Sequence, residues 1–171
     1  MNSTLMVGGG EKLLYELALF ARSQGYGVDV LILNNFRKEY YDDILTDLGV
    51  GVYRISSHKH NILKHPSNFK WKMTLKYFLA KKYSSTIIVN LSFAKKVLDM
   101  IRKPNNIHIW HISNIAQYKH IDNRFPYDES ILKDERLNLW LINKYQKEEL
   151  EAQYGQLKCK IHEFKLFLNK K

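Results

Sequence analysis

The sequence contains a single cysteine and no long apolar run, and both absences narrow what the protein can be. One thiol, Cys159, excludes an internal disulfide and a zinc site built on several cysteines. No stretch approaches the roughly 18 apolar residues that a membrane-spanning helix needs, and the first residues lack the pattern of a secretory signal peptide. Hydrophobic residues still make up 45% of the 171, enough for a packed core. We therefore expect one soluble domain, residues 1–171, in a reducing, cytoplasmic compartment.

Acidic residues are nearly absent from the middle of the chain. Between His58 and Pro104, eleven lysines and arginines accompany one acid, Asp99, whereas the rest of the chain holds 16 basic and 16 acidic residues. This segment, the basic block, therefore carries the whole formal net charge of +10. A concentrated positive field attracts phosphate groups, nucleic acid or anionic lipid. The alternative is a solvated basic face that only aids solubility.

A basic and aromatic stretch, residues 68–83, lies inside the basic block. At helical spacing its apolar side chains form two opposite faces with lysines between them, so one face can be buried while the other is offered to a partner. Lysine stems and a tryptophan suit the headgroup level of an anionic membrane. The alternative is an ordinary amphipathic core helix. The predicted membrane or anion contacts are Lys70, Trp71, Lys72, Lys76, Lys81 and Lys82.

Three histidines, His58, His60 and His65, also fall in the basic block, and two histidines two residues apart can share a metal ion. No carboxylate lies near them in the sequence. We therefore favour a basic surface loop and predict no metal site.

Short apolar runs alternate with helical patterns along the chain. Such alternation predicts an α/β fold in which a mostly parallel sheet is covered by helices on both faces. The expected helices are 11–24, 95–102 and 145–154. The expected strands are Val28–Leu33, Gly51–Ser56, Thr86–Leu91, Asn106–Ser113, Leu137–Asn143 and Lys158–Phe164.

Three consecutive glycines, Gly8, Gly9 and Gly10, precede the first expected helix. Glycine lets a ligand approach bare backbone, and free N–H groups at a helix start favour an anion. The turn is not a Walker A loop, because no Gly-Lys-Ser/Thr follows it, and it is not a GxGxxG fingerprint, because Leu13 stands where the third glycine would be. Contact with a phosphate or a sugar is one interpretation and a tight strand–helix turn is the other. Glu11 is best explained as a first-turn acid that stabilises the helix.

Ligands of parallel α/β sheets bind at the carboxyl ends of the strands, which directs attention to the end of the run 106–113. Alternation places His111 and Ile109 on one face of that strand and His108 and Trp110 on the other. His111 is the candidate catalytic side chain, and a structural histidine is the alternative. Ser113 and Asn114 follow it and can hydrogen-bond to substrate hydroxyls.

Several motifs, in this order, resemble family 4 glycosyltransferases, which have the GT-B fold. The opening GGGEK, an amphipathic helix and then GYGVDV are similar to that family's GGxE…G-h-x-V-x-V pattern. Later segments are also similar, although the last lacks the proline and glycine of the family pattern. These segments are Trp110–Ser113, Leu139–Leu150 and His162–Asn169.

The resemblance implies a three-layer Rossmann-like domain, the N-terminal, acceptor-side half of a GT-B enzyme. Gly9 and Gly10 would line the cleft facing the nucleotide-sugar diphosphate, and His111 would contact sugar or phosphate groups. The family's Glu-x7-Glu motif is absent, so the donor domain would be a partner missing from this chain. The first strand, before Gly8, is expected to be shortened. We expect no cofactor on this domain alone, a nucleotide sugar as co-substrate of the complete enzyme, and little activity from the chain by itself.

The expected function is therefore the acceptor-binding half of a glycosyltransferase. The complete enzyme would move a sugar from a nucleotide sugar to a glycan or lipid-linked acceptor, with the basic block holding it peripherally on the inner membrane. The alternative is a nucleic-acid- or nucleotide-binding module without catalysis, since a basic, aromatic segment suits phosphate contacts and base stacking. No RNP, KH, helix-turn-helix or zinc-finger pattern occurs, which disfavours nucleic acid.

Overall fold

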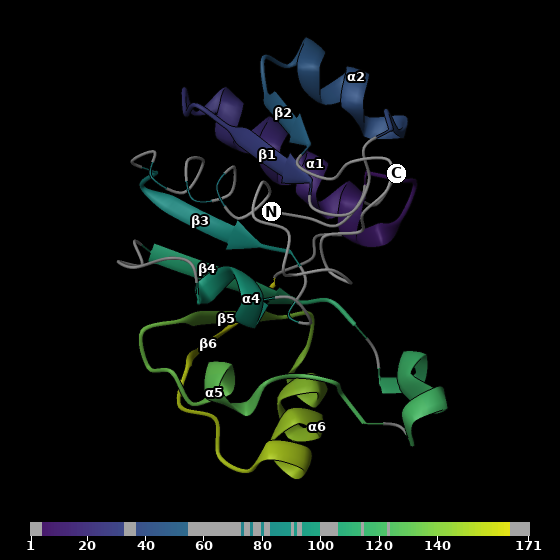
Figure 1. Cartoon of the computed structure of the whole chain (residues 1–171), viewed down its shortest axis with the longest axis vertical. Helices are drawn as coiled ribbons and strands as arrows, with labels where there is room; N and C mark the ends of the chain where they lie inside the picture. Colours follow the sequence, from purple (N-terminus) through teal and green to yellow (C-terminus); the bar gives the residue numbers. More distant parts are fainter. Residues whose placement is uncertain are drawn as a thin grey trace. The chain divides into compact units, whose positions relative to one another are not determined.

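The chain forms two compact units, Met1–Lys82 and Tyr83–Lys171, and each is described by itself. The computed structural model describes residues 5–32, 37–54, 83–89, 91, 94–99, 106–113, 115–122 and 124–164, with the single residues Met73, Lys76 and Ala80. Figure 1 shows the elements of both units and labels them in chain order.

The first unit pairs two parallel strands with two helices. Its elements are α1 (Gly9–Ser23), β1 (Asp29–Ile32), α2 (Tyr40–Asp47) and β2 (Gly51–Arg54). Val30 on β1 lies opposite Val52 on β2. Three consecutive β1 residues, Val30, Leu31 and Ile32, are buried, so both faces of this strand are covered, as in an interior strand of a parallel sheet.

Helix α2 begins at a capping box. The Glu39 side chain accepts from the backbone at Asp42, and the Asp42 carboxylate accepts from the Glu39 N–H at 2.8 Å. Arg54, at the end of β2, forms ion pairs with both carboxylates, at 3.2 Å to Glu39. Glu39 also accepts from the N–H of Leu5 at 2.6 Å. This network therefore joins the end of β2, the start of α2 and the segment before the glycine turn.

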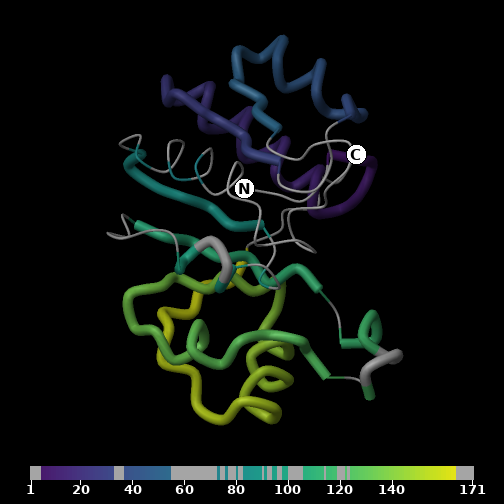
Figure 2. The backbone as a smooth tube through the Cα atoms, in the orientation of Figure 1, coloured from purple at the N-terminus to yellow at the C-terminus, as the bar shows by residue number. Residues whose placement is uncertain are grey.

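The second unit is built on a four-stranded parallel sheet in the order β3-β4-β5-β6. The strands are β3 (Ser85–Ile88), β4 (Asn106–His111), β5 (Asn138–Leu141) and β6 (Lys160–Glu163). The helical segments are α4 (Ala94–Leu98), η2 (Ile115–Ile121), α5 (Glu129–Leu132) and α6 (Lys144–Tyr154). Figure 2 traces the chain from β4 out to η2 and back to α5.

The two faces of this sheet differ in chemistry. The face that carries His111 also carries aliphatic residues: Ile109 and its register partner Leu139 are buried, and the buried Leu132 of α5 and Leu150 of α6 belong to the core. The opposite face is aromatic and polar, and Trp140 on it donates its indole N–H to His108 Nδ1 at 2.9 Å and stacks on His162. The two histidines of β4, His108 and His111, therefore lie on opposite faces of the sheet, as the alternation of side chains along a strand requires.

The α/β class with parallel sheets is confirmed, and each of the six expected strand runs overlaps a strand; β3 begins at Ser85, one residue before the expected run Thr86–Leu91. The expected helix 11–24 is α1, 145–154 is α6 with a start at Lys144, and 95–102 corresponds to the shorter α4. Helix α2, helix α5 and the η2 segment were not predicted. The single domain over 1–171 and the shortened first strand stay predictions; the described residues directly before α1, 5–8, are not in a strand.

Candidate functional site

The start of α6 fixes the end of β5. Asn143 is the N-cap, and its Oδ1 accepts from the N–H of Gln146 at 3.2 Å, so one of the free donors of the helix start is paired. Asn143 and Gln146 stand in the spacing of a capping box, Asn-x-x-Gln. At the other end, Lys133, the C-cap of α5, donates to the carbonyls of Tyr154 and Gln156, both at 2.8 Å. Helix α6 is therefore held at both ends.

The buried amide of Gln146 ties the ends of two neighbouring strands together. Its Oε1 accepts from the N–H of Ile142, after β5, at 2.6 Å. Its Nε2 donates to the carbonyl of Ser113, after β4, at 3.1 Å. Because both ends of its amide are hydrogen-bonded to the backbone, Gln146 has a structural role in the site.

A pocket of about 400 Å³ opens at these carboxyl ends of β4 and β5, where parallel α/β sheets bind ligands. Tyr145 is 61% exposed, and the Lys144 ammonium lies 5.3 Å from its ring centroid. Glu149 brings a carboxylate from the next turn of α6. An aromatic ring beside carboxylate and amide groups suits a hydroxyl-rich ligand. The lining residues are Ile112, Ser113, Ile142, Asn143, Tyr145, Gln146 and Glu149.

His111, two residues before Ser113, is only 1% exposed. Its Nδ1 is 3.2 Å from the Tyr127 hydroxyl, and the Phe125 ring stands perpendicular to the imidazole at 5.0 Å. Burial lowers the pKa of His111 from 6.5 to about 4, so the ring is neutral at pH 7. Among the described residues, Nε2 is buried without a hydrogen-bond partner. Buried polar atoms are usually hydrogen-bonded, so this unpaired nitrogen stands out among the described side chains.

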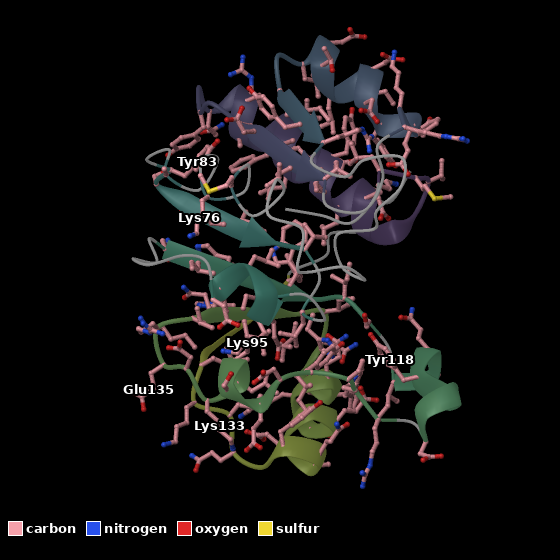
Figure 3. All side chains as sticks on the ribbon, in the orientation of Figure 1. Lys76, Tyr83, Lys95, Tyr118, Lys133 and Glu135 are labelled. Atoms are coloured by element: carbon pink, nitrogen blue, oxygen red, sulfur yellow. The ribbon has the colours of Figure 1, made fainter. Side chains whose placement is uncertain are left out.

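The segment between Ser113 and α5 returns to the sheet through Phe125 and Tyr127, both buried. The Gln153 amide pairs with the backbone of Phe125 in both directions at 2.8 Å. The Tyr154 hydroxyl donates to the carbonyl of Phe125 and accepts from the N–H of Tyr127 at 3.1 Å. Figure 3 labels Tyr118 of η2, whose hydroxyl lies 3.4 Å from that of Tyr127. Helix α6 thus secures the residues that pack on His111.

The glycine turn belongs to the other unit. Gly8 is the N-cap of α1, and a Cβ placed on it would be 2.5 Å from Glu11 Oε2. Gly9 faces open space, with nothing within 4 Å of a Cβ. The Glu11 carboxylate therefore lies against the helix start, in the first-turn position expected for it.

Of the predicted site residues, Ser113 lines the pocket and His111 lies just before it in β4. Gly8, Gly9 and Gly10 lie at the start of α1 in the first unit. Lys76 is exposed and helical (Figure 3). Asn114, Lys70, Trp71, Lys72, Lys81 and Lys82 lie outside the described residues.

Sequence reasoning missed Tyr127, Gln146 and Glu149 as site residues. The Asn-x-x-Gln spacing after a strand was a usable signal for Gln146. Glu149 faces the pocket one helical turn after Tyr145, a spacing that places both on one side of α6. Tyr127 carries no local signal, because 16 residues separate it from His111.

In the described part of the chain, no group of three or more His, Cys, Asp or Glu side chains is placed to hold a metal ion. No described helix has the length and apolarity needed to cross a bilayer. No family model matches the chain, and neither the curated proteins nor the solved structures include a significant match.

Proposed function

We propose that this chain is the acceptor-binding half of a glycosyltransferase with a three-layer, Rossmann-like architecture. In the complete enzyme, a separate donor domain would hold the nucleotide sugar, and the pocket between the ends of β4 and β5 would hold the acceptor. The observation that carries the proposal is the position and chemistry of this pocket: it lies at the carboxyl ends of parallel strands and combines Ser113, Asn143, Tyr145 and Glu149.

The lining favours a neutral, hydroxylated ring over an anion. The Glu149 carboxylate accepts hydrogen bonds from ligand hydroxyls and repels a phosphate. Tyr145 offers an exposed aromatic face against which the apolar side of a sugar ring can pack. Asn143, although its Oδ1 caps α6, adds amide donors at the mouth of the pocket.

His111 takes part in the proposed site as a neutral group. Because burial lowers its pKa to about 4, an imidazolium is scarce at neutral pH, and the residue acts through hydrogen bonds rather than as a general acid. Without the donor half, the chain by itself should transfer no sugar.

The basic block remains the proposed contact with an anionic membrane surface. Its support is the sequence: eleven basic residues and one acid between positions 58 and 104, where each cation near an anionic surface contributes about 1 kcal/mol. Sedimentation with vesicles of anionic and of neutral lipid tests it, with Lys70, Lys72, Lys76, Lys81 and Lys82 changed to Glu. Unchanged sedimentation of this variant with anionic vesicles would contradict the contact.

Saturation-transfer NMR on the intact chain tests the acceptor pocket. The probes are methyl glucosides, methyl mannosides and neutral disaccharides, with glucose 1-phosphate as the anionic comparison. We expect transfer to at least one neutral saccharide, a weaker signal for the phosphate, and loss of both in Tyr145→Ala.

The matched control is Tyr26→Ala, because Tyr26 in the first unit is also 61% exposed. This variant should retain the signal. Absence of transfer to every neutral saccharide, or equal loss in both variants, would refute the pocket assignment. Tight, salt-sensitive binding of a fluorescent oligonucleotide would instead support a nucleic-acid-binding module.

A further inference from the structure

The pocket at the ends of β4 and β5 is lined, among the described residues, by one charged side chain, and that side chain is an acid. Glu149 supplies the carboxylate from α6, and the other lining residues have uncharged side chains. The chain as a whole has the opposite balance, with 27 lysines and arginines against 17 aspartates and glutamates. The local field of the pocket therefore favours positive charge in a protein whose overall charge attracts anions.

The Glu149 carboxylate is half-buried and takes part in no ion pair within the described part of the chain. The lysines of α6 have other partners. Lys147 forms an ion pair with Glu151 at 3.8 Å, and the ammonium of Lys144 lies 5.3 Å from the centroid of the Tyr145 ring. The charge of Glu149 is therefore available to a ligand.

A ligand that fills a pocket of about 400 Å³ covers this carboxylate and removes water from it. Covering a charge is costly unless the ligand pairs with it. A hydroxyl compensates part of this cost by donating one hydrogen bond, whereas an ammonium group donates a hydrogen bond and also neutralises the charge. Tyr145 adds to the same preference, because the face of an aromatic ring attracts a cation, as the position of Lys144 over this ring illustrates.

We propose that the pocket selects, among hydroxylated rings, an amino sugar whose amine is free and protonated. The ammonium group would pair with Glu149 beside the Tyr145 ring, and the hydroxyls of the sugar would reach Ser113 and Asn143, which also line the pocket. An acetylated amine carries no charge and would lose the preference. This inference rests on the proposed function and deepens it by naming the class of acceptor.

The preference is tested with three ligands that differ at one position of the ring: methyl glucosaminide, its N-acetyl derivative and methyl glucoside. Each is titrated into the intact chain labelled with ¹⁵N, and the dissociation constant is taken from the amide shifts. An amine beside electron-withdrawing oxygens resembles an α-amino group, so it is protonated at pH 6.5 and largely neutral at pH 9.0. At pH 6.5 we expect the glucosaminide to bind about three- to tenfold more tightly than either uncharged ligand, the gain of a partly exposed, hydrogen-bonded ion pair. At pH 9.0 the three dissociation constants should converge.

Glu149→Gln removes the charge and keeps the size of the side chain, so this variant should bind the three ligands about equally. Glu148→Gln is the matched control, because Glu148 is the adjacent, exposed acid of α6 and does not line the pocket. It changes the net charge by the same amount and should retain the full preference. Equal loss of the preference in both variants would assign it to the overall charge of α6 and refute the role of Glu149.

The wild-type titrations also separate this inference from the proposed function. Equal binding of the three ligands at pH 6.5 would refute the selection of an amine and leave the acceptor pocket standing. Absence of binding by every saccharide would refute the acceptor pocket itself. Cyclohexylamine, a ring with an ammonium group and no hydroxyls, should bind more weakly than the glucosaminide. If it binds as tightly while methyl glucoside does not bind, the pocket is a site for organic cations, and the assignment to a sugar is overturned.

Discussion

Acidification should destabilise the folded protein through His111, well above the pH at which carboxylates titrate. The cause is the burial that lowers the pKa of this imidazole to about 4 from 6.5. The unfolded chain therefore binds a proton at His111 in a pH range where the folded protein does not. Between pH 6.5 and 4 the free energy of unfolding falls as the pH falls, because the unfolded state takes up more protons.

The size of the effect follows from the two pKa values. At pH 5 the imidazole is almost fully protonated in the unfolded chain and about nine-tenths neutral in the folded protein, so the loss relative to pH 7.5 is about 2 kcal/mol. Burial, followed by the charge of His162, lowers the pKa of His108 as well, which adds in the same direction. The pKa values of Asp128 and Asp134 are held below 3.8 by their hydrogen-bond partners. These carboxylates therefore contribute below this window.

Urea unfolding followed by tryptophan fluorescence at pH 7.5, 6.5, 5.5 and 5.0 measures the effect. The wild-type protein should lose about 2 kcal/mol or slightly more over this range, and His111→Gln should lose most of this dependence whatever its stability at pH 7.5. His108→Gln is the matched control and should retain the larger part of it. If His111→Gln keeps the full wild-type dependence, another group is responsible and the buried, neutral state of His111 is refuted.

Three further outcomes are expected. Arg54→Ala should lower the free energy of unfolding by about 3–5 kcal/mol in urea, because it removes the ion pairs of Arg54 with Glu39 and Asp42, whose side chains are only 6% and 11% exposed. Arg136→Ala removes an ion pair in which the arginine side chain is 71% exposed, and it should cost no more than about 1 kcal/mol. Asn143→Ala should cost about 1 kcal/mol through loss of the α6 cap, and Asn143→Asp should restore most of it; equal losses would show that the cap is unimportant. Burial raises the pKa of the Cys159 thiol to about 11, so iodoacetamide should label the protein at pH 8 only after urea is added, and rapid labelling of the native protein would contradict the buried position.

The strands were predictable because their signal is local. Residues 28–33 and 106–113 are apolar runs of strand length bounded by polar residues. Such runs are typical of strands that are buried on both faces of a parallel sheet. Helix α2 was missed because its stripe is short and its strongest signal is the reciprocal pairing of Glu39 with Asp42. The N-cap residue is a glutamate in place of the usual Ser or Asn. Glu39 also accepts hydrogen bonds from Leu5 and Arg54, and these contacts depend on tertiary structure.

The candidate site was likewise predictable only in part. The end of β4 was identifiable because the binding edge of a parallel sheet follows from strand direction, which places His111 and Ser113 there. The residues that give these two their chemistry come from distant positions: Tyr127 approaches His111 across 16 residues and Gln146 approaches Ser113 across 33. A contact between such positions depends on how α6 and the returning segment pack, and no spacing rule contains that information.

The glycine turn and the strand-end pocket are both candidate ligand sites, and they differ in the charged groups that lie beside them. At the glycine turn, the Glu11 carboxylate already lies beside Gly8 at the start of α1, so an incoming phosphate meets a negative charge at the place where the helix dipole would attract it. The pocket at β4 and β5 carries the Glu149 carboxylate too, but beside an exposed aromatic ring and amide groups that suit uncharged hydroxyls. A phosphate-bearing ligand at the turn therefore requires Glu11 to move away, whereas a neutral ligand in the pocket requires no rearrangement of charge. The second site is accordingly the one on which the proposed function is built.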